Sequence, residues 1–498
     1  MKLKKFLIIC ILPIVLNSCN DWLDVDPQDT VTEEELFSTY EGYRNALHGV
    51  YRQMSSYDMY GQEMSWGLVD VMGQLYYKSR FKSSTAYRKI ADSYAYTDKR
   101  VKPITESIWT KTYNCIANCN NLITKLQTTD PLIFPGAQEE KNLIEGEALA
   151  LRALLHFDML RLFAPSPEAA KNDDRGYIPY FSKYPSTFEP DRTVTEILNL
   201  VEQDLLKAKN LVGSFDTIPA HVDMLNMAQY RYYLSGESSY VPKDLFYRYR
   251  GYRMNYYAVT ALLARVYNYM GKHEEAYKQA NEVIDAAYGS WDTKVYSFTD
   301  AYDVESNKDR KMYEEIIFTL SNTLLLDRYK SVNNYNDNSI EFTLMTKTTD
   351  LKTMFDDGGD CRGNAVTELI GSYRACNKLL EPTGSAGNYS RSADMIPMIR
   401  LGEMYYIKAE YLFRNNDKTE ALKTLDDLRE ARGREREGLN NKINDLDSFL
   451  EELIKEAKRE FMQEGQLFYY YKRLNIKPVR TMPDNGFVIP LPDNELIN

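Results

Sequence analysis

The chain has 498 residues, of which 44% are hydrophobic and 27% are charged, and its formal net charge is −11. This length indicates one large core or two closely packed lobes, and the ordinary composition excludes global disorder. The acidic balance argues against nucleic acid or an anionic membrane surface as the main partner.

The first residues have the pattern of a secretory signal. Lys2, Lys4 and Lys5 form a positive segment, and an apolar run over 6–16, interrupted by one proline, follows it. Such a run is too short to span a bilayer as a helix, and no later segment approaches 18 consecutive apolar residues. We therefore predict a signal peptide over 1–18 and no transmembrane helix.

The junction Leu16-Asn17-Ser18-Cys19 resembles a lipobox. The resemblance implies that Cys19 is acylated and becomes the mature N-terminus, so that 19–31 is a lipid-anchored linker. Loss of three lysines with the signal would take the net charge from −11 to −14. The alternative is a chance cysteine after an ordinary signal peptide.

Helical signals dominate the remaining chain. Thr32-Glu33-Glu34-Glu35 and Thr193-Val194-Thr195-Glu196 have the pattern of capping boxes, each followed by apolar residues at helical spacing. Longer stretches rich in Pro, Tyr, Ser and Asn separate the helices, and 315–320 has the pattern of a short strand. We predict a single body over 32–498, with a loop-rich lobe mainly in 287–394 and helical repeats mainly in 32–57, 103–163, 193–211, 253–287 and 395–473. Within the last of these, the predicted helices are 395–414, 417–432 and 447–473.

Two segments have the spacing of a tetratricopeptide repeat. In 256–287 the matching positions are Ala264, Tyr267, Gly271, Ala276 and Ala280, and in 398–430 Ala409 and Ala421 are again twelve apart. Small residues let two helices approach closely, and a glycine ends the first helix of a pair. The repeats predict an all-α fold, a tetratricopeptide-like helical scaffold with the loop-rich lobe packed on it, and 139–163 with 195–211 as a third unit.

Four cysteines follow Cys19. Cys115 and Cys119 share a helix face with no histidine nearby, which favours buried thiols over a metal site. For Cys361 and Cys376, a disulfide and free thiols both remain open.

Seven motifs are spread along the chain: Cys19-Asn20-Asp21-Trp22-Leu23-Asp24, Glu147-Ala148 with Leu151-Arg152-Ala153, Asp204-Leu205-Leu206-Lys207-Ala208, Ala261-Leu262-Leu263-Ala264-Arg265-Val266-Tyr267, Arg400 with Glu403 and Ala409-Glu410, Glu460-Phe461 with Glu464-Gly465, and Ile489-Pro490-Leu491-Pro492. In content and order they resemble the motifs of the SusD/RagB family of outer-membrane nutrient-binding lipoproteins. One stretch departs from the family pattern: 466–474 carries three tyrosines where the family has an arginine and then an aromatic-Asp-Leu-x-Arg-Trp run. The departure indicates a divergent branch.

The resemblance implies a scaffold of four tetratricopeptide-like units, with a ligand site carried by the loop-rich half. It also implies a surface-exposed place at the cell outer membrane and docking on a TonB-dependent outer-membrane transporter. We therefore predict a lipid-anchored protein that binds a nutrient, foremost a glycan, and delivers it to that transporter. The sequence leaves open which glycan it binds, or whether the ligand is a peptide.

Sugar recognition needs aromatic rings against the apolar C–H faces and polar side chains at their edges. Tyrosine is abundant, with 40 Tyr against 19 Phe, which suits a sugar-binding surface and equally suits the rims of packed helices. The candidate ligand-binding residues in irregular stretches are Trp66, Asp70, Tyr76, Tyr77, Arg80, Trp291 and Tyr296. For each aromatic residue the alternative is packing within the core or a loop.

The sequence carries no GxSxG, HExxH, P-loop or GxGxxG motif in a fitting context, and the four histidines are scattered. We predict no catalytic residue, no cofactor and no metal ligand. The acidic run 356–360 lacks the full calcium-loop pattern and favours a solvated turn over a Ca²⁺ site. The alternatives to nutrient capture are a lipid-anchored helical glycosidase or lyase and a protein-binding repeat scaffold.

Overall fold

The computed structural model describes residues 32–186, 188–232, 242–333, 343–347, 354–355, 359–381, 389–434, 439, 442–493 and 495. The predicted signal peptide over 1–18 and the predicted linker over 19–31, with Cys19, lie outside the described residues. So do Asp356, Asp357 and Gly358 of the acidic run.

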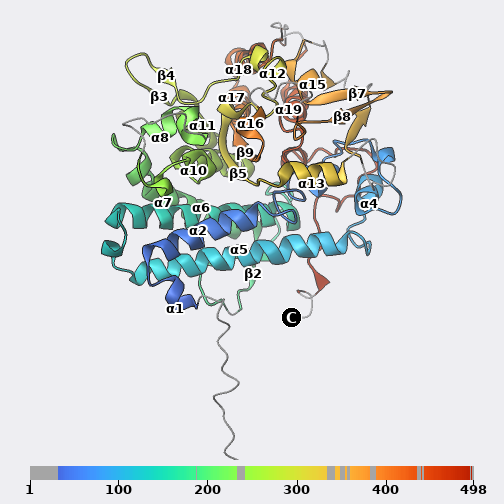
Figure 1. The fold of residues 1–498 in the computed structure, drawn as a ribbon. Helices are drawn as coiled ribbons and strands as arrows, with labels where there is room; N and C mark the ends of the chain where they lie inside the picture. Colours follow the sequence, from blue (N-terminus) through green and yellow to red (C-terminus); the bar gives the residue numbers. More distant parts are fainter. Residues whose placement is uncertain are drawn as a thin grey trace, which may run out of the picture.

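The described chain is mainly helical, as the sequence predicts (Figure 1). The longer helices are α2 (Tyr40–Met54), α5 (Lys102–Thr128), α6 (Ala137–Phe163), α7 (Val194–Asp216), α10 (Tyr256–Met270), α11 (His273–Asp285), α17 (Leu401–Arg414), α18 (Lys418–Ala431) and α19 (Leu446–Glu460). The shorter ones are α1 (Glu33–Leu36), α3 (Leu68–Met72), α4 (Ala86–Ser93), α8 (Asp223–Asn226), α9 (Ala228–Tyr232), α12 (Ala301–Glu305), α13 (Leu325–Val332), α15 (Cys361–Ala365), α16 (Tyr389–Ser392) and α20 (Leu467–Arg473).

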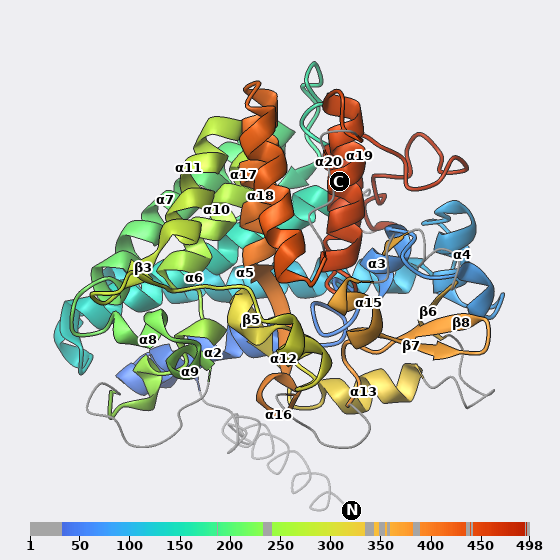
Figure 2. The same cartoon turned by 90° about the horizontal axis from the view of Figure 1, so that it is seen from above.

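The long helices pack side by side in chain order, α5 on α6, α6 on α7, α7 on α10, α10 on α11, α11 on α17 and α17 on α18. Seen from above, α7, α10, α11, α17, α18 and α19 are arranged across one side of the molecule (Figure 2). The repeat residues explain the close packing, because Ala264, Ala276, Ala280, Ala409 and Ala421 are all fully buried. Gly271 ends α10 in the left-handed region at φ 76°, which a glycine adopts without strain. The predicted all-α, tetratricopeptide-like fold is confirmed.

The strands form small antiparallel sheets. β5 (Ile316–Ser321) pairs with β9 (Met395–Arg400), and β8 (Tyr373–Cys376) lies between β6 (Met345–Lys347) and β7 (Thr367–Ile370). Two short hairpins complete the set, β1 (Ile178–Pro179) with β2 (Asp191–Arg192) and β3 (Ala287–Tyr288) with β4 (Thr293–Lys294). Figure 2 shows the three-stranded sheet beside α4, on the side away from α7 and α11.

Two predicted helix boundaries differ from the structure. The helix predicted over 395–414 begins only at Leu401, because 395–400 pair with β5 as a strand. The helix predicted over 447–473 is divided into α19 and α20. Gln463 and Gly465 between them have φ values of 64° and 70°, which a continuous right-handed helix excludes. The strand predicted over 315–320 is confirmed as β5.

The four cysteines that the structure describes are all buried free thiols, so Cys361 and Cys376 do not form a disulfide there. Among the helices that the structure describes, none combines the length and the apolar character needed to cross a membrane.

His156 lies in the core of α6 and makes stability depend on pH. The backbone N–H of Phe181 donates to its Nε2 at 3.1 Å, so Nδ1 carries the proton and donates to the carbonyl oxygen of Arg152 at 3.0 Å. Burial and then the charge of Arg152 lower the pKa of His156 from 6.5 to about 3. The unfolded state therefore binds more protons than the folded state between these values, and stability falls as the pH drops below 6.5.

We expect His156→Gln to remove this part of the acid sensitivity. The slope of unfolding free energy against pH should become shallower by up to about 1.4 kcal/mol per pH unit within that window. Urea denaturation of both proteins at several pH values between 4 and 7 measures the difference. Parallel slopes for the wild type and the variant would contradict the assignment of this effect to His156.

Candidate functional site

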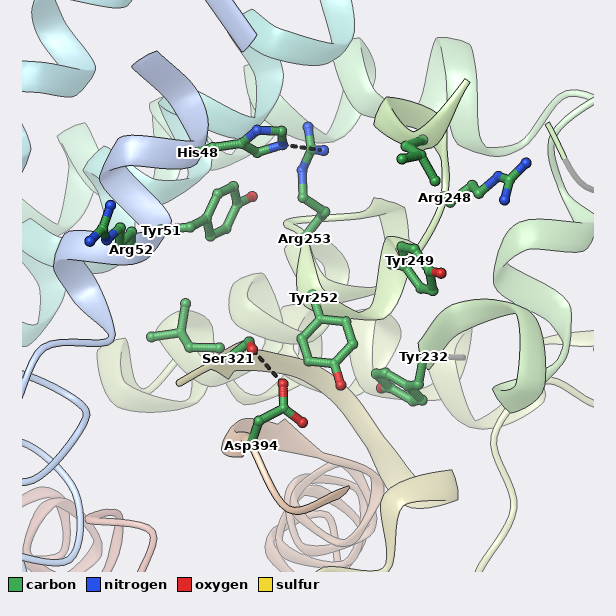
Figure 3. Close-up of a pocket in the computed structure, with 12 residues that line it drawn as sticks. His48, Tyr51, Arg52, Tyr232, Arg248, Tyr249, Tyr252, Arg253, Ser321 and Asp394 are labelled. Atoms are coloured by element: carbon green, nitrogen blue, oxygen red, sulfur yellow. Dashed lines mark hydrogen bonds between the residues drawn. The ribbon is translucent and has the colours of Figure 1, made fainter. Parts of the chain in front are cut away.

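An open cavity of about 570 Å³ lies where α2, α9, the segment 245–253 and the ends of β5 and β9 meet (Figure 3). Its lining residues are His48, Tyr51, Arg52, Tyr232, Leu245, Arg248, Tyr249, Tyr252, Arg253, Leu320, Ser321 and Asp394. The cavity is open to solvent, as the exposure of four lining residues shows: His48, Arg52, Leu245 and Ser321. The volume lies within the ~300–1,000 Å³ typical of small-molecule sites.

The segment 245–253 forms one wall. It consists of two short 3₁₀ turns, η4 (Leu245–Tyr247) and η5 (Arg250–Tyr252), joined through Tyr249. Tyr249 has φ 58°, in the left-handed region that a bulky residue rarely adopts, and it directly precedes the second turn. Residues held in this region are found at functional sites when the surrounding structure fixes them.

Buried ion pairs hold this wall against the helical scaffold. Glu147 of α6 accepts hydrogen bonds from Arg250 Nη1 at 2.5 Å and from Arg253 Nε at 2.6 Å. Arg250 also pairs with Asp216 of α7 through two bonds of 2.9 Å. The side chains of Glu147 and Arg250 are fully buried, so the wall depends on these pairs for its position.

The opposite wall is the face of α2 that carries His48, Tyr51 and Arg52. The Tyr51 hydroxyl donates to Glu147 at 2.7 Å and accepts from the backbone N–H of Met254 at 2.8 Å. The same carboxylate therefore joins both walls. Partial desolvation and then the charge of Arg253 lower the pKa of His48 to about 4. The neutral imidazole accepts from Arg253, with 3.4 Å between its Nε2 and the Arg253 Nη1.

The floor is polar and aromatic. Ser321 at the end of β5 donates to the carboxylate of Asp394, which precedes β9 (Figure 3). The backbone N–H of Asn322 donates to the Asp394 carbonyl oxygen at 2.8 Å, so the two strand ends are tied together. Burial first, and then the nearby Asp394 carboxylate, raise the pKa of Tyr252. Its hydroxyl therefore keeps its proton and can donate it to a hydrogen-bond acceptor.

The cavity thus offers four tyrosines together with arginine, hydroxyl and carboxylate groups on its rim and floor. This combination suits a ligand with apolar faces and many hydroxyls. Within the part of the chain that the structure describes, no group of three or more His, Cys, Asp or Glu side chains is arranged to hold a metal ion.

The structure places four of the predicted ligand-binding residues in the core. Trp66, Asp70, Tyr76 and Tyr296 are 1%, 0%, 5% and 2% exposed. Trp66 Nε1 donates to the carbonyl oxygen of Gly61 at 2.8 Å, and the Tyr76 hydroxyl donates to that of Trp66 at 2.8 Å. Asp70 accepts from the Gly465 N–H at 3.1 Å. Tyr296 packs against Tyr257, with 5.8 Å between ring centroids. None of the four side chains has a surface to offer a ligand, so the sequence-based expectation is corrected for these four.

The other three predicted residues lie outside the core and outside the cavity lining. Tyr77 is half-buried and stacks on Tyr373, with 5.6 Å between ring centroids and 22° between ring planes. The Arg80 guanidinium lies 5.3 Å from the centroid of the same Tyr373 ring. Trp291 is 90% exposed in the turn of the β3–β4 hairpin.

Sequence reasoning missed the cavity residues. One signal was available, because the run Phe246-Tyr247-Arg248-Tyr249-Arg250-Gly251-Tyr252-Arg253 interleaves aromatic residues with arginines. The remaining lining residues are not marked by any pattern in the sequence around them, because α2, β5 and Asp394 are far apart in the chain and meet only in the folded protein.

Comparison with known proteins agrees with this fold. A family model described as "Starch-binding associating with outer membrane" matches residues 21–220, and the SusD family model matches residues 220–488. A curated relative, the SusD-like protein P38 of Formosa agariphila, is 24% identical over 95% of this chain and 91% of its own length.

Solved structures share the architecture. A putative sugar-binding protein from Bacteroides vulgatus is 20% identical, with a TM-score of 0.65 over 92% of this chain and 96% of its own. A SusD superfamily protein from Bacteroides thetaiotaomicron has a TM-score of 0.63 at 20% identity, over 92% and 97% of the two chains. A laminarin-binding SusD-like protein has a TM-score of 0.60 at 18% identity, over the same shares. Because the SusD family model matches residues 220–488, more than half of the chain, and the related model matches residues 21–220, this chain belongs to the SusD family.

Proposed function

We propose that this chain is a cell-surface binding protein that captures an oligosaccharide in the cavity between α2 and 245–253 and delivers it to a TonB-dependent outer-membrane transporter. The observation that carries the proposal is the open, tyrosine-lined cavity of about 570 Å³ in a protein of the SusD family. The family model's description as starch-binding and outer-membrane-associated supports the same class of ligand and the same location.

The cavity chemistry fits a sugar. Tyrosine rings cover the apolar C–H face of a pyranose, and their hydroxyls remain available at the ring edge. Tyr51, Tyr249 and Tyr252 are each half-buried, so their rings are held in place and still reach the open space. The helices α2 and α6 provide the rigid support that a preformed site needs.

Anchoring belongs to the same proposal. Acylation of Cys19 would tether the protein to the outer membrane, and the linker over 19–31 would let the body sit over the transporter. Detection of a lipid-modified N-terminal peptide by mass spectrometry tests the anchor. Co-purification with the product of a neighbouring gene for a plug-bearing barrel tests the transporter.

Binding without hydrolysis is the favoured activity. Of the twelve described residues that line the cavity, Asp394 alone carries a carboxylate. Hydrolysis of a glycosidic bond usually requires two carboxyl groups across the scissile bond, ~5–9.5 Å apart. We therefore expect no release of reducing ends when the pure protein is incubated with a polysaccharide panel, and sustained turnover would favour the glycosidase alternative.

Two surfaces outside the cavity are proposed as additional contacts for a long glycan. One is the stacked pair Tyr77 and Tyr373 with Arg80, and the other is Trp291. Retention of a polysaccharide in an affinity gel should weaken in Tyr77→Ala or Trp291→Ala if either surface contacts the chain.

The decisive test is Tyr249→Ala. Loss of one aromatic contact is expected to lower oligosaccharide affinity about tenfold, because ~1–1.5 kcal/mol corresponds to that factor. The unfolding midpoint should change little, since the ring is only half-buried. Isothermal titration with oligosaccharides, including laminarin fragments, measures the affinity.

Tyr302→Ala is the matched control, because Tyr302 is 67% exposed on α12 and does not line the cavity. It should bind like the wild type. Equal affinities for Tyr249→Ala and the wild type would exclude the cavity as the glycan site and favour the scaffold alternative.

A further inference from the structure

The charges around the cavity differ in sign from the charge of the whole chain. The protein has a net charge of −11. The cavity lining nevertheless contains three arginines, Arg52, Arg248 and Arg253, against the single carboxylate of Asp394. Some of these charges are already neutralised by partners within the protein. The charges that are not neutralised decide what kind of ligand the cavity favours.

The charge of Arg253 is matched internally. Its Nε donates to Glu147 at 2.6 Å, and its Nη1 donates to the Phe246 carbonyl oxygen at 3.2 Å. The side chain is nearly buried, at 6% exposure, so this guanidinium supports the wall and adds no free charge. His48 adds none either, because its imidazole is neutral at neutral pH.

Arg248 is held in place without being neutralised. Its Nε donates to the carbonyl oxygen of Pro242 at 2.5 Å, and its Nη2 donates to that of Lys243 at 3.2 Å. Both acceptors are uncharged. The neighbouring Asp244 is directed to Arg44, with 2.9 Å between Oδ2 and Nη1. No carboxylate within the described residues forms an ion pair with Arg248.

Arg52 lies across the cavity on α2 and is exposed (Figure 3). No ion pair within the described part of the chain engages its guanidinium either. The Asp394 carboxylate accepts a hydrogen bond from the uncharged Ser321 hydroxyl, so it keeps its negative charge. Among the described residues, the lining therefore has two guanidinium groups without a carboxylate partner, on opposite walls, against the single carboxylate of Asp394.

We infer that the oligosaccharide taken by this cavity is anionic, carrying carboxylate or sulfate groups that Arg52 and Arg248 bind from opposite sides. This inference rests on the proposed function and narrows its ligand class. Guanidinium groups bind carboxylate and sulfate oxygens through charge-assisted, often bidentate hydrogen bonds, which are roughly twice as strong as neutral ones. A neutral sugar would leave both positive charges without a counterpart.

The test compares three oligosaccharides of equal length by isothermal titration with the full chain: an oligogalacturonate, a sulfated carrageenan fragment and a neutral laminarin fragment. The better of the two anionic ligands should bind at least about tenfold more tightly than the neutral one, and its affinity should fall as salt is raised. The carboxylate and sulfate arms show which anion the site prefers, and either preference supports the inference.

Arg52→Gln and Arg248→Gln should each weaken binding of that anionic ligand about tenfold and weaken binding of the neutral ligand by a clearly smaller factor. The control is Arg480→Gln, because Arg480 is exposed and lies outside the cavity lining. Unfolding midpoints of all three variants should match the wild type.

Two results would overturn the inference while leaving the proposed function standing. One is neutral binding as tight as anionic binding, with Tyr249→Ala still weakening it. The other is an anionic preference that Arg480→Gln reduces as much as the cavity variants do, since the attraction would then be non-specific. Absence of any cavity-dependent oligosaccharide binding would instead overturn the proposed function itself.

Discussion

Glu460→Gln is expected to lower the free energy of unfolding by about 3–5 kcal/mol, because it removes the charge that three buried guanidinium groups share. Glu460 ends α19, and its carboxylate accepts from Arg362 Nη1 at 2.6 Å, Arg432 Nη2 at 2.8 Å and Arg400 Nη1 at 3.0 Å. All four side chains are buried. The glutamine would leave the arginines with less negative charge in a region that water does not reach.

The pH dependence of this contribution has a definite sign. Burial alone would raise the pKa of Glu460, but Arg432, Arg400 and Arg362 hold it well below the ordinary 4.5. The stabilisation is therefore complete above pH 4.5 and is lost as the pH falls further. Urea denaturation at neutral pH measures the effect of the substitution.

Glu451→Gln is the matched control, because Glu451 is an exposed residue of the same helix. It should change the unfolding free energy by less than about 0.5 kcal/mol. A Glu460→Gln protein as stable as this control would show that the buried arginines do not depend on Glu460.

The helices were the most predictable part of the fold because their signals are local. Thr32 with Glu35 and Thr193 with Glu196 form the reciprocal capping boxes that the sequence predicts. The sequence predicts helix where the structure has strand β9, because the partner strand β5 lies about eighty residues earlier and nothing near Met395 reveals the pairing. The structure explains the motif Glu460-Phe461 with Glu464-Gly465, because both glutamates accept hydrogen bonds from the buried guanidinium group of Arg400.

The site was less predictable because burial is decided by distant segments. Trp66 and Tyr249 both lie in irregular stretches, and sequence alone gives no reason to separate them. In the fold, Tyr329 of α13 packs against Trp66 with 5.0 Å between ring centroids and helps to seal it in the core. Tyr249 instead lies on a turn held by Glu147, about a hundred residues away, and lines the cavity.

Glu147→Gln is expected to weaken both stability and ligand binding. Its carboxylate joins α6 to the 245–253 wall through Arg250 and Arg253, and to the α2 wall through Tyr51. Burial alone would raise the pKa of Glu147, but Arg253 and Arg250 hold it below its ordinary value. Removing the charge should cost about 3–5 kcal/mol in unfolding free energy, and it should release the wall that carries Tyr249.

Glu145→Gln, two residues earlier on α6, is the control. Glu145 pairs with Lys207, which is 56% exposed, so its loss should cost less than about 1 kcal/mol and leave affinity unchanged. Should Glu147→Gln fail to fold, the milder substitution Tyr51→Phe tests the same connection between the two cavity walls. It keeps the ring, removes one hydrogen bond to Glu147 and leaves the Met254 N–H without its acceptor.

For Tyr51→Phe we expect a loss of about 1–3 kcal/mol in unfolding free energy. Oligosaccharide affinity should fall with it, because the hydroxyl fixes the distance between the two walls. Denaturation and isothermal titration on the same preparation separate the two effects. A variant that loses stability but binds with wild-type affinity would show that the cavity keeps its shape without Glu147, and the wall would then have to be positioned by the Arg250–Asp216 pair.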